Sequence, residues 1–146
     1  MILSYIIFGS SSGHLDALLR GLVLGRLGKC GHPETVAEAQ KRFAAHCTGE
    51  SVLPADLRTA VYSTVLKAGD QTTLEAVLKL LRDADLHEER VRLMRCMGSV
   101  SKPELINQVL NFSLSVSDSI LILRNDTFQR MAAKTPLTYR QIPLGI

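Results

Sequence analysis

Tryptophan is absent from this 146-residue sequence, and aromatic residues make up only 5% of it. A hydrophobic core must therefore be built mainly from aliphatic side chains. Hydrophobic residues are 46% of the chain, which is enough for such a core, and the length is that of about one domain. Charged residues account for 21%, so the composition is typical of a soluble globular protein rather than a disordered or membrane protein.

A cluster of charges of one sign is also missing. The formal net charge is +3, and basic residues alternate with acidic residues along most of the chain. This pattern is typical of solvated helix faces, whereas a surface for nucleic acid needs a patch of a single sign. We therefore expect no nucleic-acid partner.

The sequence has no apolar run long enough to cross a membrane. The run at the N-terminus, Ile2 to Phe8, follows no positive charges and is shorter than the apolar part of a usual signal peptide. A weak signal-like start and a segment cut from a longer protein are both consistent with it. We expect no membrane partner.

Cysteines are few and widely separated. Cys30, Cys47 and Cys96 have no C-x-x-C spacing, and their odd number excludes complete pairing within the chain. A reducing compartment fits this pattern, and we predict a cytoplasmic location. Buried structural thiols are the preferred interpretation over a reactive cysteine, because no basic or His partner lies near any of them in a recognisable motif.

The histidine pairs of zinc peptidases are absent too. The stretch LHEERVR contains His87-Glu88, but a helix of the H-E-x-x-H type needs a second His four residues after the first, where Val91 stands. The other three histidines have no partner at such a spacing. We interpret Glu88 as a helix-capping residue and His87 as a residue of the first turn. No metal and no cofactor is expected in this chain.

Motifs for nucleotides and nucleophiles are missing as well. The stretch GLVLGRLGKCG has Val23 and Cys30 where a phosphate-binding loop requires Gly and Ser or Thr. There is no G-x-S-x-G sequence either, so no catalytic residue is expected. We predict instead that Gly21 and Gly25 permit close helix packing and that Gly28 to Gly31 ends a helix.

The residues that are present follow helical spacing, with apolar side chains three and four positions apart. The first predicted helix starts at His14, the second at Pro33, and the third after Pro54. Their predicted core stripes are Leu15, Leu18, Leu19, Leu22, Val23 and Leu27; then Val36, Ala39, Phe43 and Cys47; then Leu57, Ala60, Val61, Thr64, Val65 and Ala68.

Three further helices are predicted from a capping-box pattern at their starts, in which a short polar residue is followed three positions later by Glu. The pairs are Thr72 with Glu75, Asp85 with Glu88, and Ser101 with Glu104. Successive pairs of helices start roughly thirty residues apart, close to the repeat of helical solenoids. We predict an all-α fold of about six helices, arranged as antiparallel hairpins stacked into an α-solenoid.

Arg58 and Tyr62 are the candidate binding residues. They lie four positions apart and therefore share a helix face, distinct from the stripe of Leu57 and Val61. The pair could line a groove, because Arg suits peptide carboxylates. The alternative, which we favour, is an exposed Arg resting on a Tyr ring.

Two segments, GHLDALLRGLVLGRLGKCGH and DLRTAVYSTVLKAGDQTTLEAVLKL, resemble the C-terminal helical domain of zinc aminopeptidases of the puromycin-sensitive type. The resemblance runs from about Gly13 to about Ser115. It implies a HEAT-like helical superhelix that closes over a zinc-bearing domain and forms a wall of the peptide chamber. The family's H-E-x-x-H helix, its G-A-M-E-N loop and its catalytic Tyr are absent here, so the resemblance assigns no catalytic or metal residue.

We therefore expect three parts: residues 1–13, an apolar and Ser/Gly-rich start that does not match; residues 14–115, the helical-repeat domain; and residues 116–146, a divergent, irregular tail. The leading hypothesis is a non-catalytic, truncated piece of a zinc aminopeptidase, with zinc held by the full-length enzyme. Under this hypothesis the chain binds peptides or proteins, including the catalytic domain. Self-association through the exposed ends of the helical array is also expected. The alternatives are a piece of an active aminopeptidase and a free-standing protein-binding scaffold.

Overall fold

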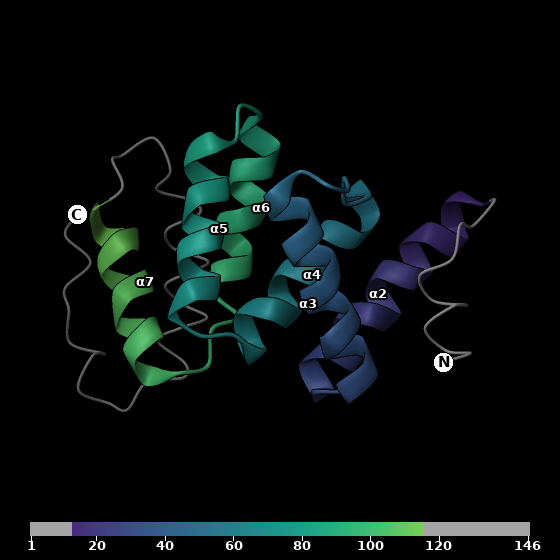
Figure 1. The fold of residues 1–146 in the computed structure, drawn as a ribbon, viewed down its shortest axis with the longest axis horizontal. Coiled ribbons are helices and arrows are strands. Elements are labelled where there is room, and N and C mark those ends of the chain that lie inside the picture. The colour runs from purple at the N-terminus through teal and green to yellow at the C-terminus, as the bar shows by residue number, and fades with distance from the viewer. Residues whose placement is uncertain (1–12, 116–146) are drawn as a thin grey trace, which may run out of the picture.

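The structure is a computed structural model that describes residues 13–115. This part of the chain contains six α-helices and no strand (Figure 1). The all-α prediction is therefore confirmed. The predicted tail and, apart from Gly13, the predicted N-terminal part lie outside the described residues. The helices are α2 (His14–Cys30), α3 (Pro33–Thr48), α4 (Ala55–Ala68), α5 (Gln71–Asp83), α6 (His87–Met97) and α7 (Pro103–Ser115).

The helices form an extended array with α2 at one end and α7 at the other (Figure 1). Helix α4 packs against both α2 and α6, so these three helices lie in one row, while α3 packs on α4 and α5 packs on α6. A hydrogen bond from Gln108 Nε2 to Gln71 Oε1, 2.9 Å long, joins α7 to α5. This succession of stacked helices is the arrangement expected of an α-solenoid.

Helix α4 is the centre of the core, because it contacts α2, α3, α5 and α6. Its buried side chains face more than one direction, as expected of a helix surrounded by others. Only Phe43 and Tyr62 among the aromatic residues of the described part belong to the buried core, which is otherwise aliphatic and sulfur-containing. The buried residues of α4 are Leu57, Ala60, Val61, Tyr62, Thr64, Val65 and Leu66.

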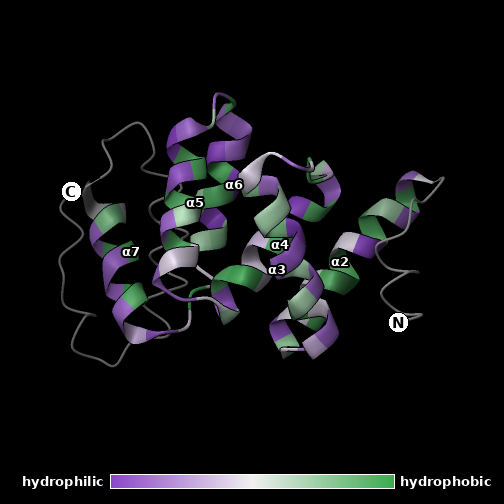
Figure 2. Ribbon diagram, viewed as in Figure 1, coloured by the Kyte–Doolittle hydropathy of each residue, from purple (hydrophilic) through white to green (hydrophobic). Residues whose placement is uncertain are grey.

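Helix α2 packs with the face opposite to the one predicted. Its buried residues are Leu24 and Gly28. The predicted leucine stripe is largely exposed instead, and Figure 2 shows hydrophobic residues along this end helix. The physical reason is that glycines let the helix axes approach closely, which a stripe of leucines would prevent. The exposed residues are Leu15 at 78%, Leu18 at 55%, Leu19 and Leu22 at 59%, and Val23 at 37%.

Gly21, Gly25 and Gly28 lie where α2 contacts α4, and a Cβ atom at Gly25 would make only an ordinary contact, 3.9 Å from the Ala60 Cβ. A Cβ atom at Gly21 would lie 2.7 Å from the Asp56 carbonyl oxygen, so the predicted close packing there is confirmed. At Gly28 a Cβ atom would lie 2.9 Å from the Thr64 Cβ and Cγ2 atoms, so this residue packs inside the helix rather than ending it. The helix ends at Cys30, and Gly31 follows in the left-handed conformation with φ of 75°.

The predicted helix starts are correct to within about one residue, but the predicted caps are wrong. Helix α5 is capped by Asp70, whose Oδ1 accepts the Thr73 N–H at 3.3 Å. Thr72 lies inside the helix, and its hydroxyl donates to the same carboxylate at 2.6 Å. Asp70 rather than Thr72 caps the helix because the negative charge of a carboxylate is favourable at a helix N-terminus.

The other two predicted caps fail for different reasons. Helix α6 begins one residue later than the Asp85 cap requires, and Leu86 occupies the N-cap position without a side-chain cap bond. Helix α7 begins at Pro103, and the Ile106 N–H donates to the Lys102 carbonyl. Pro103 starts the helix because its fixed φ suits the first position, which places the cap one residue after Ser101.

Of the three thiols, Cys96 is buried, as predicted, whereas Cys30 and Cys47 are exposed. The prediction of buried structural thiols is therefore wrong for two of them. Both lie on helix surfaces near the ends of α2 and α3, where the packing does not reach.

None of the described helices is long and apolar enough to cross a membrane.

Candidate functional site

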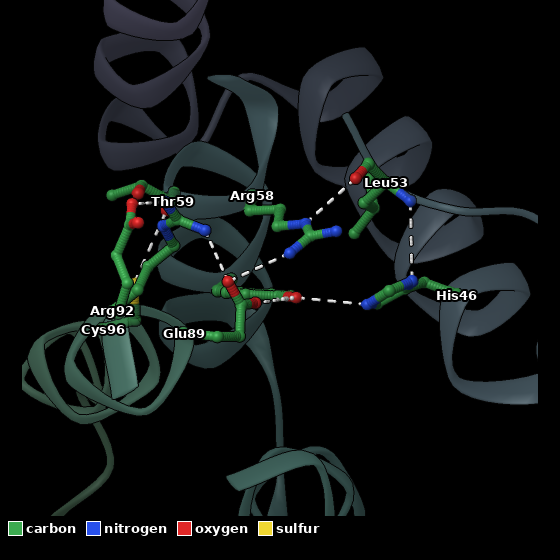
Figure 3. A network of polar contacts seen from close by, with 9 residues as sticks. His46, Leu53, Arg58, Thr59, Glu89, Arg92 and Cys96 are labelled. Atoms are coloured by element: carbon green, nitrogen blue, oxygen red, sulfur yellow. Dashed lines mark hydrogen bonds and ion pairs between the residues drawn. The ribbon is translucent and has the colours of Figure 1, made fainter. Parts of the chain in front are cut away.

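Glu89 is the centre of a polar network that joins α4 to α6 (Figure 3). Its Oε1 atom accepts a hydrogen bond of 2.9 Å from the Tyr62 hydroxyl. Its Oε2 atom accepts one of 3.1 Å from Arg58 Nη1 and another from Arg92 Nη1. One carboxylate thus binds two side chains of α4 and one of its own helix.

The network continues to α3 and to the connection that leads from α3 to α4. Arg58 Nε donates to the Leu53 carbonyl at 3.0 Å, and the Leu53 N–H donates to His46 Nδ1 at 3.5 Å. The Tyr62 hydroxyl lies 3.2 Å from His46 Nε2. Because its single proton goes to Glu89, we assign the N–H of this pair to His46 Nε2. The network therefore links three helices and one connection.

These polar side chains are held mostly out of water. Tyr62 is 1% exposed, and the side chains of Glu89, Arg92 and Arg58 are 14%, 18% and 22% exposed. The Phe43 ring meets the Tyr62 ring edge-on, with centroids 6.1 Å apart. Arg58 and Tyr62 are four residues apart on α4, and Glu89 and Arg92 are three apart on α6. Each pair therefore lies on one face of its helix.

The charges of the network favour an ionised Glu89. Burial alone raises the pKa of this carboxyl group, but hydrogen bonds from Tyr62 and Arg58 and the charges of Arg58 and Arg92 outweigh it, so the net pKa is lowered. Burial, together with the hydrogen bond to Glu89 and its negative charge, raises the pKa of the Tyr62 hydroxyl. The carboxylate therefore stays charged and the phenol stays neutral at physiological pH.

The arrangement is suited to holding helices together rather than to proton transfer. Both oxygens of Glu89 accept hydrogen bonds from protein groups, and the lowered pKa makes this carboxylate a weaker base than usual. Among the side chains that the structure describes, no buried nitrogen or oxygen lacks a hydrogen-bond partner. We therefore describe this cluster as the Glu89 clamp, comprising His46, Leu53, Arg58, Tyr62, Glu89 and Arg92.

Arg58 and Tyr62, the two candidate residues from the sequence, are both directed at Glu89. Arg58 does not rest exposed on the Tyr62 ring, because Tyr62 is buried and the guanidinium group binds the carboxylate. A place in the wall of a peptide groove stays a prediction for this pair.

The residues around His87 do not fit a zinc site. His87 is the exposed first residue of α6, and Glu88 forms an ion pair of 2.9 Å with Arg92. In the described part of the chain, no group of three or more His, Cys, Asp and Glu side chains could hold a metal ion. The ligands of a zinc peptidase are therefore not assembled by these residues.

Sequence reasoning missed His46, Glu89 and Arg92. The one available signal was the spacing of Glu89 and Arg92, three apart on a helix, together with Arg58 and Tyr62, four apart on another. Spacing cannot show that the two helices face each other, and that contact creates the clamp.

Comparison with known proteins gives matches over most of the chain. The profile of the ERAP1-like C-terminal domain matches residues 3–137. Aminopeptidase M1-A of Oryza sativa subsp. japonica is 36% identical over 124 residues, and Aminopeptidase M1 of Arabidopsis thaliana is 39% identical over 107 residues. These alignments cover 79% and 70% of this chain but only 14% and 12% of the two relatives.

Proposed function

The chain belongs to the family of ERAP1-like C-terminal domains found in M1 aminopeptidases, and from this premise we propose that it serves as a non-catalytic helical part of a zinc aminopeptidase. The observation that carries the proposal is the Glu89 clamp. This charged cluster joins helix to helix, and both oxygens of Glu89 accept hydrogen bonds from protein side chains.

The proposed role is to form part of a helical wall. The family resemblance implies a superhelix that closes over the zinc domain and lines the chamber in which peptides bind. A wall must keep its curvature, and the clamp supports this by fixing α6 against α4 and the α3–α4 connection. We propose that the chain, as part of this wall, contacts peptides or the catalytic domain and contributes no zinc ligand. The proposed location is the cytoplasm.

A second candidate function is favoured by the small share of each relative that this chain spans. If the chain is a piece of a longer protein, the whole protein is an active aminopeptidase. The sequence H-E-x-x-H upstream in the same transcript would support this candidate, and the helical part would keep the role proposed above.

The wall proposal is tested by a chimera of Aminopeptidase M1 of Arabidopsis thaliana in which residues 13–115 of this chain replace the matching segment. We expect aminopeptidase activity within about tenfold of the parent, because the replacement keeps the helical wall and leaves the zinc domain untouched. The measurement is kcat/KM on an aminoacyl substrate, before and after mild heating.

Two variants of the chimera supply the controls. Glu89→Ala, which opens the clamp, should inactivate at a lower temperature, whereas Glu88→Ala, one residue away and exposed, should behave like the unmodified chimera. A chimera that folds and elutes like the parent but has no activity would contradict the proposed role.

A further inference from the structure

His46 of α3 lies between two fixed neighbours, and each of them determines which ring nitrogen carries the hydrogen (Figure 3). The Leu53 N–H faces the Nδ1 atom at 3.5 Å, so Nδ1 accepts and carries no hydrogen. The Tyr62 hydroxyl lies 3.2 Å from Nε2 and donates its own hydrogen to Glu89, so Nε2 must donate. The two contacts therefore require the same form of the ring, a neutral imidazole with its hydrogen on Nε2.

The contact at Nδ1 holds the connection from α3 to α4, residues 49–54. Leu53 is 3% exposed, and within the described part of the chain its N–H has no other acceptor. Its carbonyl accepts the hydrogen bond of 3.0 Å from Arg58 Nε. The two peptide groups that flank Leu53 are thus held by side chains, one from α3 and one from α4. A buried N–H group that loses its acceptor is unfavourable, so the bond to Nδ1 stabilises this conformation of the connection.

Protonation of His46 is incompatible with the contact to Leu53. The imidazolium ion carries a hydrogen on each nitrogen, so an Nδ1–H group would face the Leu53 N–H group, donor against donor. The bond from Nε2 to the Tyr62 hydroxyl would remain. Histidine is the side chain whose charge ordinarily changes between about pH 5 and 8. A modest fall in pH therefore removes one specific contact of the connection.

The charged groups on α4 and α6 offer no acceptor for the added hydrogen. Among the described residues, His46 forms no ion pair with a carboxylate. Glu89 of α6 lies beyond the Tyr62 hydroxyl, and its charge is already shared by Arg58 and Arg92. Arg58 also places a positive charge beside the Leu53 carbonyl.

The other helices near His46 do not supply an acceptor either. Arg42, four residues earlier on α3, forms an ion pair of 2.8 Å with Glu38. The charge of Lys79 on α5 acts on Cys47, the residue after His46. Helix α2 also contacts α3, but none of its described side chains forms a hydrogen bond or ion pair with His46. A protonated His46 thus gains no ion pair in exchange for the lost Leu53 contact.

We propose that His46 is an acid-sensitive latch: the neutral ring holds the α3–α4 connection against α3, and protonation releases the Leu53 N–H while the helices stay packed. The switch changes the conformation of the connection rather than that of the helical array, because the contacts of the Glu89 clamp between α4 and α6 do not involve Nδ1. The inference does not depend on the aminopeptidase role proposed above, because it rests on His46 and its neighbours alone.

Nuclear magnetic resonance of the full 146-residue chain provides the test. Long-range proton–nitrogen spectra of the His46 ring should show at about pH 8 a hydrogen on Nε2 and none on Nδ1. As the pH falls to about 5, the protection factor of the Leu53 amide hydrogen should fall by about tenfold or more, with the midpoint of the His46 titration. The amide of Val65, buried inside α4, should keep its protection because the helices stay packed.

Two matched substitutions locate the effect. A glutamine side chain gains no proton in this range, so in His46→Gln the Leu53 protection factor should be the same at about pH 5 and about pH 8. His87→Gln, at the exposed first residue of α6, should keep the fall seen in the unmodified chain. The position of the ring hydrogen is read on the unmodified chain, so the test does not depend on the folding of either variant.

Four results would overturn the proposal. A hydrogen on Nδ1 at about pH 8 would contradict the form of the ring that the latch requires. An unchanged Leu53 protection factor across the His46 titration, or an equal fall in His46→Gln, would show that His46 does not control the connection. Parallel loss of protection at Leu53 and Val65 would mean that the whole domain opens instead.

Discussion

Replacing Glu89 with Ala should lower the free energy of unfolding by about 3 kcal/mol, because it leaves two mostly buried guanidinium groups without their shared anion. Tyr62 would lose its hydrogen-bond acceptor at the same time. In a domain of this size the expected fall in Tm is roughly 10 °C. Thermal and urea unfolding followed by circular dichroism measure the effect.

Glu88 provides the control for this prediction. It is the preceding residue on the same helix, carries the same charge and pairs with the same Arg92, but its side chain is 84% exposed. Glu88→Ala should therefore cost no more than about 0.5 kcal/mol, as is usual for exposed ion pairs. Equal losses for the two variants would mean that the Glu89 clamp does not hold the helices together.

The pH dependence of unfolding gives a second readout of the clamp. The pKa of Glu89 is lower in the folded protein than its ordinary value of 4.5. Its stabilising effect is therefore complete above that ordinary value and is lost as the pH falls through the lower folded value. The difference in unfolding free energy between the unmodified chain and Glu89→Gln should shrink as the pH is lowered from about 7 to about 3. A constant difference would contradict the assignment.

Gly28→Ala should destabilise the protein by about 2 kcal/mol, although alanine is the better helix former by about 1 kcal/mol. The added methyl group would lie 2.9 Å from the Thr64 Cβ and Cγ2 atoms, and the helices must separate to admit it. Thr64 Oγ1 would clash with the methyl group as well. Adding Thr64→Ala removes Oγ1 and Cγ2 and leaves only Cβ, so the double variant should regain part of the loss.

Gly25→Ala is the matched substitution on the same helix. Its Cβ would lie 3.9 Å from the Ala60 Cβ, an ordinary contact, so the gain in helix propensity should stabilise the protein by about 0.5 to 1 kcal/mol. The two glycines are three residues apart, yet their variants should differ in sign. Stabilisation by both substitutions would show that α2 does not pack on α4 at Gly28.

Sequence patterns predicted the helices well because local signals fix them. Pro33 begins α3, and Gly31 and Gly49 adopt the left-handed conformation that ends α2 and α3. The packing face of α2 could not be predicted in the same way. Its leucines form the stronger apolar stripe, but Gly28 lies against Thr64, and such contact between backbones leaves no hydrophobic signal in the sequence.

The candidate site was predicted only in part, for a related reason. The spacing of Arg58 and Tyr62 showed that they share a face of one helix. Their common partner, Glu89, is 27 residues from Tyr62, and no local pattern marks it as buried rather than solvated. Among the cysteines, likewise, the chain alone could not show that Cys96 is buried whereas the other two are exposed. Contacts between helices, rather than helices themselves, were the missing information.

The measurement that tests the central claim most directly is a peptidase assay on the purified 146-residue chain. Peptides with free N-termini are incubated with the chain, with and without added zinc, and the released amino acids are quantified. A non-catalytic helical part predicts no release above buffer in either condition. Release that follows the chain through successive purification steps, and that a chelator abolishes, would contradict the account.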